Sequence, residues 1–164
     1  MIFNKTQLHP SSRVWIYQAN RKLTAEETAF IHSFLAKEID EWSAHGAALK
    51  AGFEIRFDQI ICIFADESQH AASGCSIDSS TRWFKDLGAK FGIDFFDRSA
   101  AIVQENGLQL IPFLEIKKAV ENGIIESETF IATPQVPNLA YYANQWPEKA
   151  SDSWLKRYFK QATI

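Results

Sequence analysis

The chain is poor in the residues that mark several whole classes of protein. Its 164 residues include only two cysteines, seven glycines, five prolines and one methionine. So little glycine and proline excludes collagen-like and low-complexity chains, and two cysteines do not build a disulfide-rich scaffold. No apolar run approaches the roughly 20 residues of a membrane-spanning helix, and residues 1–5 lead into polar residues, not into an apolar signal core. We therefore expect a globular, cytoplasmic protein with no membrane partner.

Charge of one sign is also scarce. The 17 basic and 20 acidic residues are interleaved and give a net charge of −3. The densest cationic stretch is Lys156 and Arg157 with Lys160, whereas binding to a phosphate backbone needs several convergent cations. We expect no nucleic-acid partner, and we expect Cys62 and Cys75 to be reduced thiols.

The motifs of nucleotide, metal and serine-hydrolase chemistry are missing. The chain has no phosphate-binding P-loop, no Gly-x-Gly-x-x-Gly and no Gly-x-Ser-x-Gly, so ATP hydrolysis has no support in the sequence. Cys62, His70 and Cys75 have spacings unlike those of zinc ribbons and zincins. Asp66 and Glu67 are neighbours at the end of a predicted strand, where their side chains point to opposite faces. No metal and no cofactor are predicted.

Aromatic residues are what the chain has in abundance, with thirteen Phe, five Trp and four Tyr. Much of this content falls on predicted apolar faces, where the rings fill the core in place of methionine. The remainder is concentrated in the final quarter, at Tyr141, Tyr142, Trp146, Trp154, Tyr158 and Phe159. The pattern leaves open whether this tail covers its own core or a partner's.

Hydrophobic periodicity and turn residues predict alternating strands and helices. Thr24 begins a capping box and Gly46 follows an apolar helical face, so we expect a helix over residues 24–45. A second helix is expected to end at Gly92, and Asn106-Gly107 indicates a hairpin. The predicted strands are residues 13–18, 53–57, 60–65, 100–104, 108–111 and 129–132, and the shorter helices are residues 113–122, 139–146 and 151–159. The continuous apolar run at 60–65 predicts a central strand covered on both faces.

The order strand, helix, strand, strand, helix, strand is that of the split βαβ, or ferredoxin-like, arrangement. We predict an α+β protein whose helices lie on one face of an antiparallel sheet. The whole chain, 1–164, is expected to form one domain, with a core at about 13–112 and a C-terminal elaboration and helical docking tail at about 113–164.

The segment 66–80 is the best candidate for a functional site, because it joins a buried strand to a helix N-terminus. Free backbone N–H groups and the helix dipole favour anions at such a place, and they lower the pKa of a thiol. Cys75 is therefore a candidate nucleophile, and Gly74 allows close approach of a ligand. A structural interpretation stands beside this one: Ser76 or Asp78 is an ordinary N-cap and Cys75 a small buried residue.

A nucleophilic cysteine needs a base within reach, and the candidates are His70 on the same loop and His45 at the end of the first predicted helix. Arginines elsewhere in the chain can supply charge for an anion. The candidate ligand-binding residues are Asp66, Glu67, Ser68, Ser73, Gly74, Ser76, Asp78, Ser79, Arg98 and Arg157.

Several of these residues belong to stretches that resemble an uncharacterised bacterial family labelled "ABC transporter ATPase". The stretches are Trp-Ser-Ala-His-Gly at 42–46, Asp-Glu-Ser at 66–68, Ser-Gly-Cys-Ser-Ile-Asp-Ser-Ser at 73–80, Phe-Asp-Arg at 96–98, and Asp-Ser-Trp at 152–154 with Arg157. The label implies ATP hydrolysis, which requires the P-loop that this chain lacks. The resemblance implies a shared site, and it favours His45 over His70 as the partner of Cys75 because His70 lies outside the shared stretches.

Two functions remain open from the sequence. The first is a binding or assembly module, which takes a small anion at the 66–80 loop or forms a homodimer through its aromatic surface. The second is an enzyme that uses Cys75, with His45 as base, on a small anionic or carbonyl substrate. The pH dependence of thiol alkylation tests the second: a Cys75 that is unreactive in the folded protein would exclude it.

Overall fold

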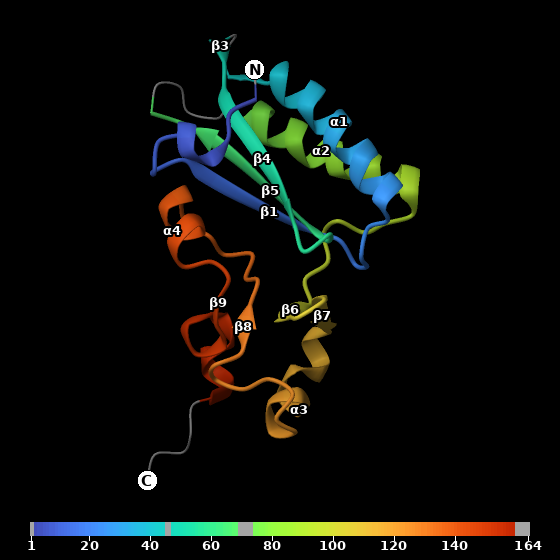
Figure 1. The fold of residues 1–164 in the computed structure, drawn as a ribbon, viewed down its shortest axis with the longest axis vertical. Helices are drawn as coiled ribbons and strands as arrows, with labels where there is room; N and C mark the ends of the chain where they lie inside the picture. Colours follow the sequence, from blue (N-terminus) through green and yellow to red (C-terminus); the bar gives the residue numbers. More distant parts are fainter. Residues whose placement is uncertain (1, 45–46, 69–73, 160–164) are drawn as a thin grey trace.

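The first half of the chain forms a three-stranded antiparallel sheet with two long helices on one face (Figure 1). The strands are β1 (Arg13–Gln18), β4 (Lys50–Arg56) and β5 (Ile60–Asp66), in the order β1-β5-β4. The helices are α1 (Ala25–Asp40) and α2 (Gly74–Phe91). A short 3₁₀ turn, η1 (Lys5–Gln7), precedes β1. The computed structural model describes residues 2–44, 47–68 and 74–159.

Helix α1 begins as the sequence predicts and ends earlier. The Thr24 side chain accepts from the backbone N–H of Glu27, and the Glu27 carboxylate accepts from the N–H of Thr24, which completes the expected capping box. The helix ends at Asp40, not at residue 45. Trp42 explains the difference: its ring packs 6.0 Å from that of Trp15 and 5.1 Å from that of Trp83, and it is buried. The chain then forms a small hairpin from β2 (Ser43–Ala44) and β3 (Ala47–Ala48).

Strand β5 is the centre of the sheet, and every residue in it is buried. Ile61, Ile63 and Ala65 face the helices, where they join apolar residues of α1 and α2 in one core cluster. Ile60, Cys62 and Phe64 belong to a second cluster on the opposite face. The prediction that this apolar run is a central strand covered on both faces is confirmed.

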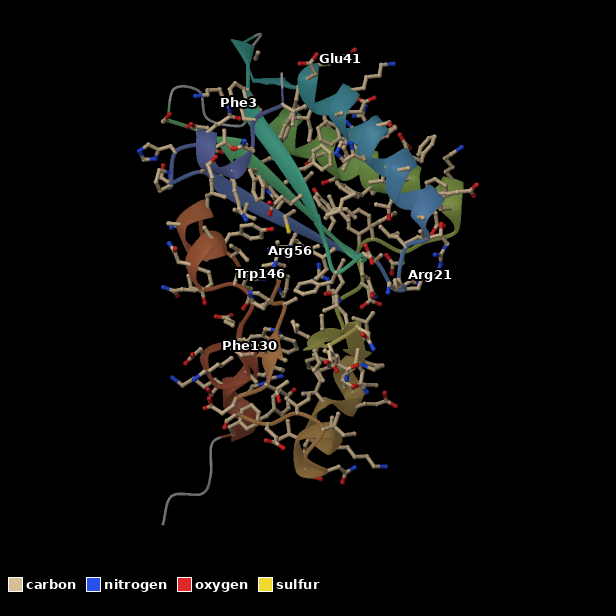
Figure 2. The ribbon with its side chains drawn as sticks, in the orientation of Figure 1. Phe3, Arg21, Glu41, Arg56, Phe130 and Trp146 are labelled. Carbon is tan, nitrogen blue, oxygen red and sulfur yellow. The ribbon has the colours of Figure 1, made fainter. Side chains whose placement is uncertain are left out.

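The second face of the sheet is covered by α4 (Leu139–Asn144), from the C-terminal quarter of the chain (Figure 1). Tyr142 is almost fully buried there, and its hydroxyl donates to Glu54 (2.6 Å) and accepts from Arg56 (3.2 Å). The Arg56 guanidinium lies 5.1 Å from the centre of the Trp146 ring, between the sheet and the tail (Figure 2). Cys62 is fully buried in this cluster, and its burial raises the pKa of the thiol to about 12.

The remainder of the chain forms a second antiparallel sheet, with strand order β7-β6-β8-β9. It contains β6 (Ala100–Gln104), β7 (Gly107–Ile111), β8 (Phe130–Ile131) and β9 (Glu148–Lys149). The hairpin between β6 and β7 is confirmed, with Glu105 and Asn106 in the turn and Gly107 opening β7. The helical segments around this sheet are η2 (Phe113–Glu115), α3 (Ile116–Glu121), η3 (Ala150–Asp152) and η4 (Trp154–Phe159).

The described residues do not form the predicted four-stranded ferredoxin-like sheet. Ala100–Gln104, the strand that such a sheet requires beside β1, pairs instead with β7 and β8 in the second sheet. The edge of β1 makes one parallel bridge, between Gln18 and Phe96. Phe95 is buried in the first core and Gln18 binds the backbone that follows, so the chain is held at this edge and then turns away. The fold is α+β with two antiparallel sheets.

The aromatic tail covers the chain's own core. Tyr142 and Trp146 are buried against the first sheet, and Leu155 is buried against the second. The path from β8 to α4 and back to β9 therefore ties the two sheets together (Figure 1). None of the helices in the described ranges is long and apolar enough to cross a membrane.

Candidate functional site

The residues proposed from the sequence do not form one site, and three of them lie at opposite ends of β1. Asp66 and Glu67 lie beside Arg13, because Arg13 pairs with Ala65 in the sheet and lies 3.4 Å from the Glu67 carboxylate. Arg98 lies beside Gln18 at the other end of the strand, about 17 Å away at the usual rise per residue. The structure does not bring Asp66, Glu67 and Arg98 together.

Asp66 is a buried acceptor for the backbone around it. Its Oδ2 accepts from the His9 N–H (3.2 Å) and its Oδ1 accepts from the Ser68 N–H (2.9 Å). Burial by itself raises the pKa of this carboxyl, but the hydrogen bonds from Ser68 and His9, with the charge of Lys50, bring the pKa below its ordinary value. Asp66 is thus an ionised group that holds two loops at the end of β5.

The hydroxyl and carboxylate groups of α2 are spread along the helix. Asp78 is exposed, Ser79 is half-buried, and Ser80 is fully buried. The Ser80 hydroxyl donates to the Ile77 carbonyl (2.8 Å) and lies 3.1 Å from the Tyr17 hydroxyl. Ser80 therefore joins the helix to β1 and is not available for an anion.

The proposed catalytic pair lies outside the part of the chain that the structure describes. His45, His70 and Ser73 fall outside the described residues, and so do the side chains of Cys75 and Ser76, while Gly74 is described by its backbone alone. The backbone of α2 begins at Gly74, so Ser76 and Asp78 lie within the helix and neither is its N-cap, contrary to the structural interpretation from the sequence. Among the described residues, no cluster of three metal-ligating side chains occurs.

A cleft of about 470 Å³ lies at the junction of the two sheets, where the edge of β1 meets the connection from α2 to β6. Its size is within the range of pockets that bind small molecules. The floor comes from the end of β1, including Tyr17 and Gln18, and the wall comes from residues 95–99. The second half of the chain supplies the other side, with Phe113, Pro134, Gln135 and Trp154.

Gln18 fixes the backbone on both sides of Arg98. Its Nε2 donates to the Ser99 carbonyl (3.0 Å) and to Oδ1 (3.3 Å) and the carbonyl (3.5 Å) of Asp97. All three neighbouring atoms are oxygens that accept hydrogen bonds, so the side-chain nitrogen of Gln18, and not its side-chain oxygen, faces them. Asp97 Oδ1 also accepts from the Ser99 N–H (2.8 Å), so the loop that carries Arg98 is closed by its own bonds and by β1.

Arg98 is the one basic side chain among the described residues that line the cleft. It is exposed, and no described residue makes a hydrogen bond or an ion pair with its guanidinium. Its acidic neighbour Asp97 is already bonded to Gln18 and Ser99. The five N–H donors of Arg98 therefore have no acceptor among the described residues, and the side chain belongs to the lining of the cleft.

Exposed aromatic rings line the same cleft as Arg98. Phe96 is 40% exposed and Phe113 is 55% exposed, which is unusual for side chains of this size. The Phe96 ring stands edge-on to Tyr17, with the ring centres 5.8 Å apart. The guanidinium of Arg157 lies 5.8 Å from the centre of the Phe113 ring and donates to the Tyr158 hydroxyl (2.9 Å). Arg157, the second arginine proposed from the sequence, is therefore next to the cleft and covers one of its rings.

The sequence points to Arg98 and Arg157 as candidate binding residues, but it does not point to the cleft that Arg98 lines and Arg157 adjoins. The sequence predicts a strand at Gln18, a short helix at Phe113 and a docking tail at Trp154. Nothing in these predictions indicates that the three residues line one cleft. The arrangement depends on β6 leaving the first sheet, which local patterns do not encode.

Comparison with models of protein families, with curated proteins and with solved structures found no match to this chain.

Proposed function

We propose that the protein binds a small organic anion in the cleft between its two sheets, with Arg98 as the group that recognises the charge. The observation that carries this proposal is an exposed guanidinium, without a partner among the described residues, on a cleft lined by rings. A buried or half-buried ion pair is worth more than one in open water, so a cleft strengthens recognition by Arg98. This site lies at the Gln18 end of β1, whereas the sequence predicted an anion site in the 66–80 loop at the other end of the strand.

The test is a titration of the full chain, followed by backbone amide shifts in NMR, with the carboxylates benzoate and cyclohexanecarboxylate. Benzylammonium and cyclohexylammonium serve as probes of opposite charge. We expect at least one carboxylate to shift the amides of residues 95–99 and of Gln135, and neither ammonium probe to do so. Higher salt should weaken the binding, because the recognition is electrostatic.

Arg98→Gln is expected to reduce the affinity at least tenfold, which corresponds to about 1.4 kcal/mol. Arg82→Gln is the matched control, since Arg82 is an exposed arginine of α2 that does not line the cleft. Equal affinity in the wild type and in Arg98→Gln, or equal binding of carboxylates and ammonium ions, would contradict the proposal.

A second candidate function is self-assembly, and a separate observation favours it. Leu114 is 92% exposed and adjoins the exposed Phe113, so two large apolar residues face the solvent side by side in the chain. We expect the wild type to form a dimer in light-scattering measurements of mass, and Leu114→Glu to shift it to monomer. Phe30→Glu, which changes an exposed apolar residue of α1, is the control. A wild-type chain that stays monomeric at all accessible concentrations contradicts this second function.

A further inference from the structure

We propose that the anion taken by the cleft is a planar aromatic carboxylate, stacked against Phe113 and Phe96 while its carboxylate meets Arg98. This inference rests on the proposed function, and it names the chemical class that the same cleft selects. It follows from the kind of surface that the cleft exposes, from how its rings are held, and from the balance of charge around Arg98.

The exposed surface of the cleft is aromatic on both of its sides. Phe96 comes from the connection between α2 and β6, and Phe113 comes from the start of η2. Both rings expose about half of their surface, and Trp154 lies half-buried on the same side as Phe113. Exposed rings gain most from a flat apolar partner, because such a partner removes apolar area from water and also offers a stacking or edge contact.

The rings are held in place before any ligand arrives. Phe96 is fixed edge-on to Tyr17, whose own ring is stacked 3.8 Å from that of Phe84 in the core. Phe113 is covered on one side by Arg157, and Arg157 is held in turn by the Tyr158 hydroxyl. A ligand therefore loses little affinity to the ordering of side chains, provided that its shape is flat enough to lie against them.

The charge of the cleft favours a carboxylate over a phosphate ester. Arg98 is the one cation among the described lining residues, and the carboxylate of Asp97 is its neighbour in the chain. A planar guanidinium matches a carboxylate with two parallel hydrogen bonds. A phosphate ester carries up to two charges near neutral pH, so Asp97 repels it more strongly than it repels a carboxylate with one charge.

The experiment compares affinities for the full chain, measured by calorimetry, across four probes. They are 2-naphthoate, benzoate, cyclohexanecarboxylate and phenyl phosphate. We expect the two aromatic carboxylates to bind at least tenfold more tightly than cyclohexanecarboxylate, which has the same charge and a puckered ring. Phenyl phosphate should bind more weakly than benzoate.

Phe113→Leu should reduce this preference for aromatic carboxylates at least threefold while leaving the affinity for cyclohexanecarboxylate nearly unchanged. Phe30→Leu is the control, because Phe30 is similarly exposed but lies on α1, outside the cleft. Phe113 is more than half exposed, so the variant is expected to fold, and Phe96→Leu provides a second, independent variant.

The outcomes separate the two proposals. Equal binding of all carboxylates, with loss in Arg98→Gln, overturns the aromatic class and leaves the anion site standing. Tighter binding of phenyl phosphate than of benzoate overturns the carboxylate assignment. Absence of binding by every anion overturns both.

Discussion

At the scale of a residue, the absence of a side chain at Gly52 lets the N-terminal segment pack against β4. A Cβ built on Gly52 in β4 would lie 1.8 Å from the carbonyl oxygen of Phe3, which is backbone and cannot swing aside. The Phe3 N–H donates to the Ala51 carbonyl (3.0 Å), so the N-terminal segment is held directly over the strand. Only glycine permits this close approach.

We therefore expect Gly52→Ala to reduce the free energy of unfolding by about 2–3 kcal/mol, because the N-terminal segment must shift or detach. Urea denaturation followed by fluorescence measures the loss. Gly123→Ala is the control: it has open space around it and a φ of +75°, so it should lose only about 1 kcal/mol. A smaller loss for Gly52→Ala than for Gly123→Ala would show that the contact with Phe3 is not restrictive.

The turn between β4 and β5 has a backbone conformation that the sequence does not predict. Phe57 and Asp58 both have a positive φ, of 58° and 52°, although neither is glycine. Sequence patterns favour Asn-Gly in such a turn, and no local signal places a phenylalanine there. The ring of Phe57 packs against that of Trp146, with ring centres 5.9 Å apart. The two residues are far apart in the chain, so local sequence patterns do not predict this contact.

At the scale of an element, the start of α1 carries a charge network beyond its capping box. The two terminal guanidinium nitrogens of Arg21, Nη1 and Nη2, donate to the Glu27 carboxylate, at 2.9 and 2.8 Å. These bonds, with those from Thr24, lower the pKa of Glu27 from its usual 4.5 to about 2. Since the folded state holds Glu27 ionised, this stabilisation is complete above about pH 4.5 and disappears as the pH falls through about 2.

Glu27→Gln should accordingly cost about 1–2 kcal/mol of unfolding free energy at pH 7, a value kept modest because solvent screens the exposed side of Arg21. The difference from wild type should shrink as the pH falls from 4.5 towards 2. Glu26→Gln is the matched control, as Glu26 is an exposed acid in the same first turn. Chemical denaturation at several pH values measures both, and a difference for Glu27→Gln that is constant with pH would contradict the assignment.

Elements with a strong local signal were predicted closely. The strand at Arg13–Gln18 has the predicted bounds, and the helix start at Thr24 and the helix end before Gly92 were also found, because capping side chains and glycine act within a few residues. The end of α1 was wrong because Trp42 leaves the helix to pack with Trp15 and Trp83. The end of α1 therefore depends on contacts between residues far apart in the chain, which local sequence patterns do not reveal.

At the scale of the whole molecule, the sequence indicated an α+β chain but not how its strands divide between sheets. The separation depends on a few contacts at the edge of β1, chiefly the three bonds from Gln18 to Asp97 and Ser99. Local patterns predict that 100–104 is a strand, yet they do not say which neighbour it pairs with. The cleft that both Arg98 and Phe113 line follows from that pairing, so the proposed binding site was the part least accessible to prediction.

The covering of the first sheet by α4 has a consequence for how the protein is made. Glu54 and Tyr142 are hydrogen-bonded although 88 residues separate them in the chain. A ribosome releases the N-terminal strands first, so the face formed by Ile60, Cys62 and Phe64 waits uncovered while the second sheet is synthesised. Apolar surface that is exposed in this way during synthesis promotes aggregation, and a chain truncated before α4 would leave this face without that cover. The last quarter of the chain thus protects the first half from association as well as completing the fold.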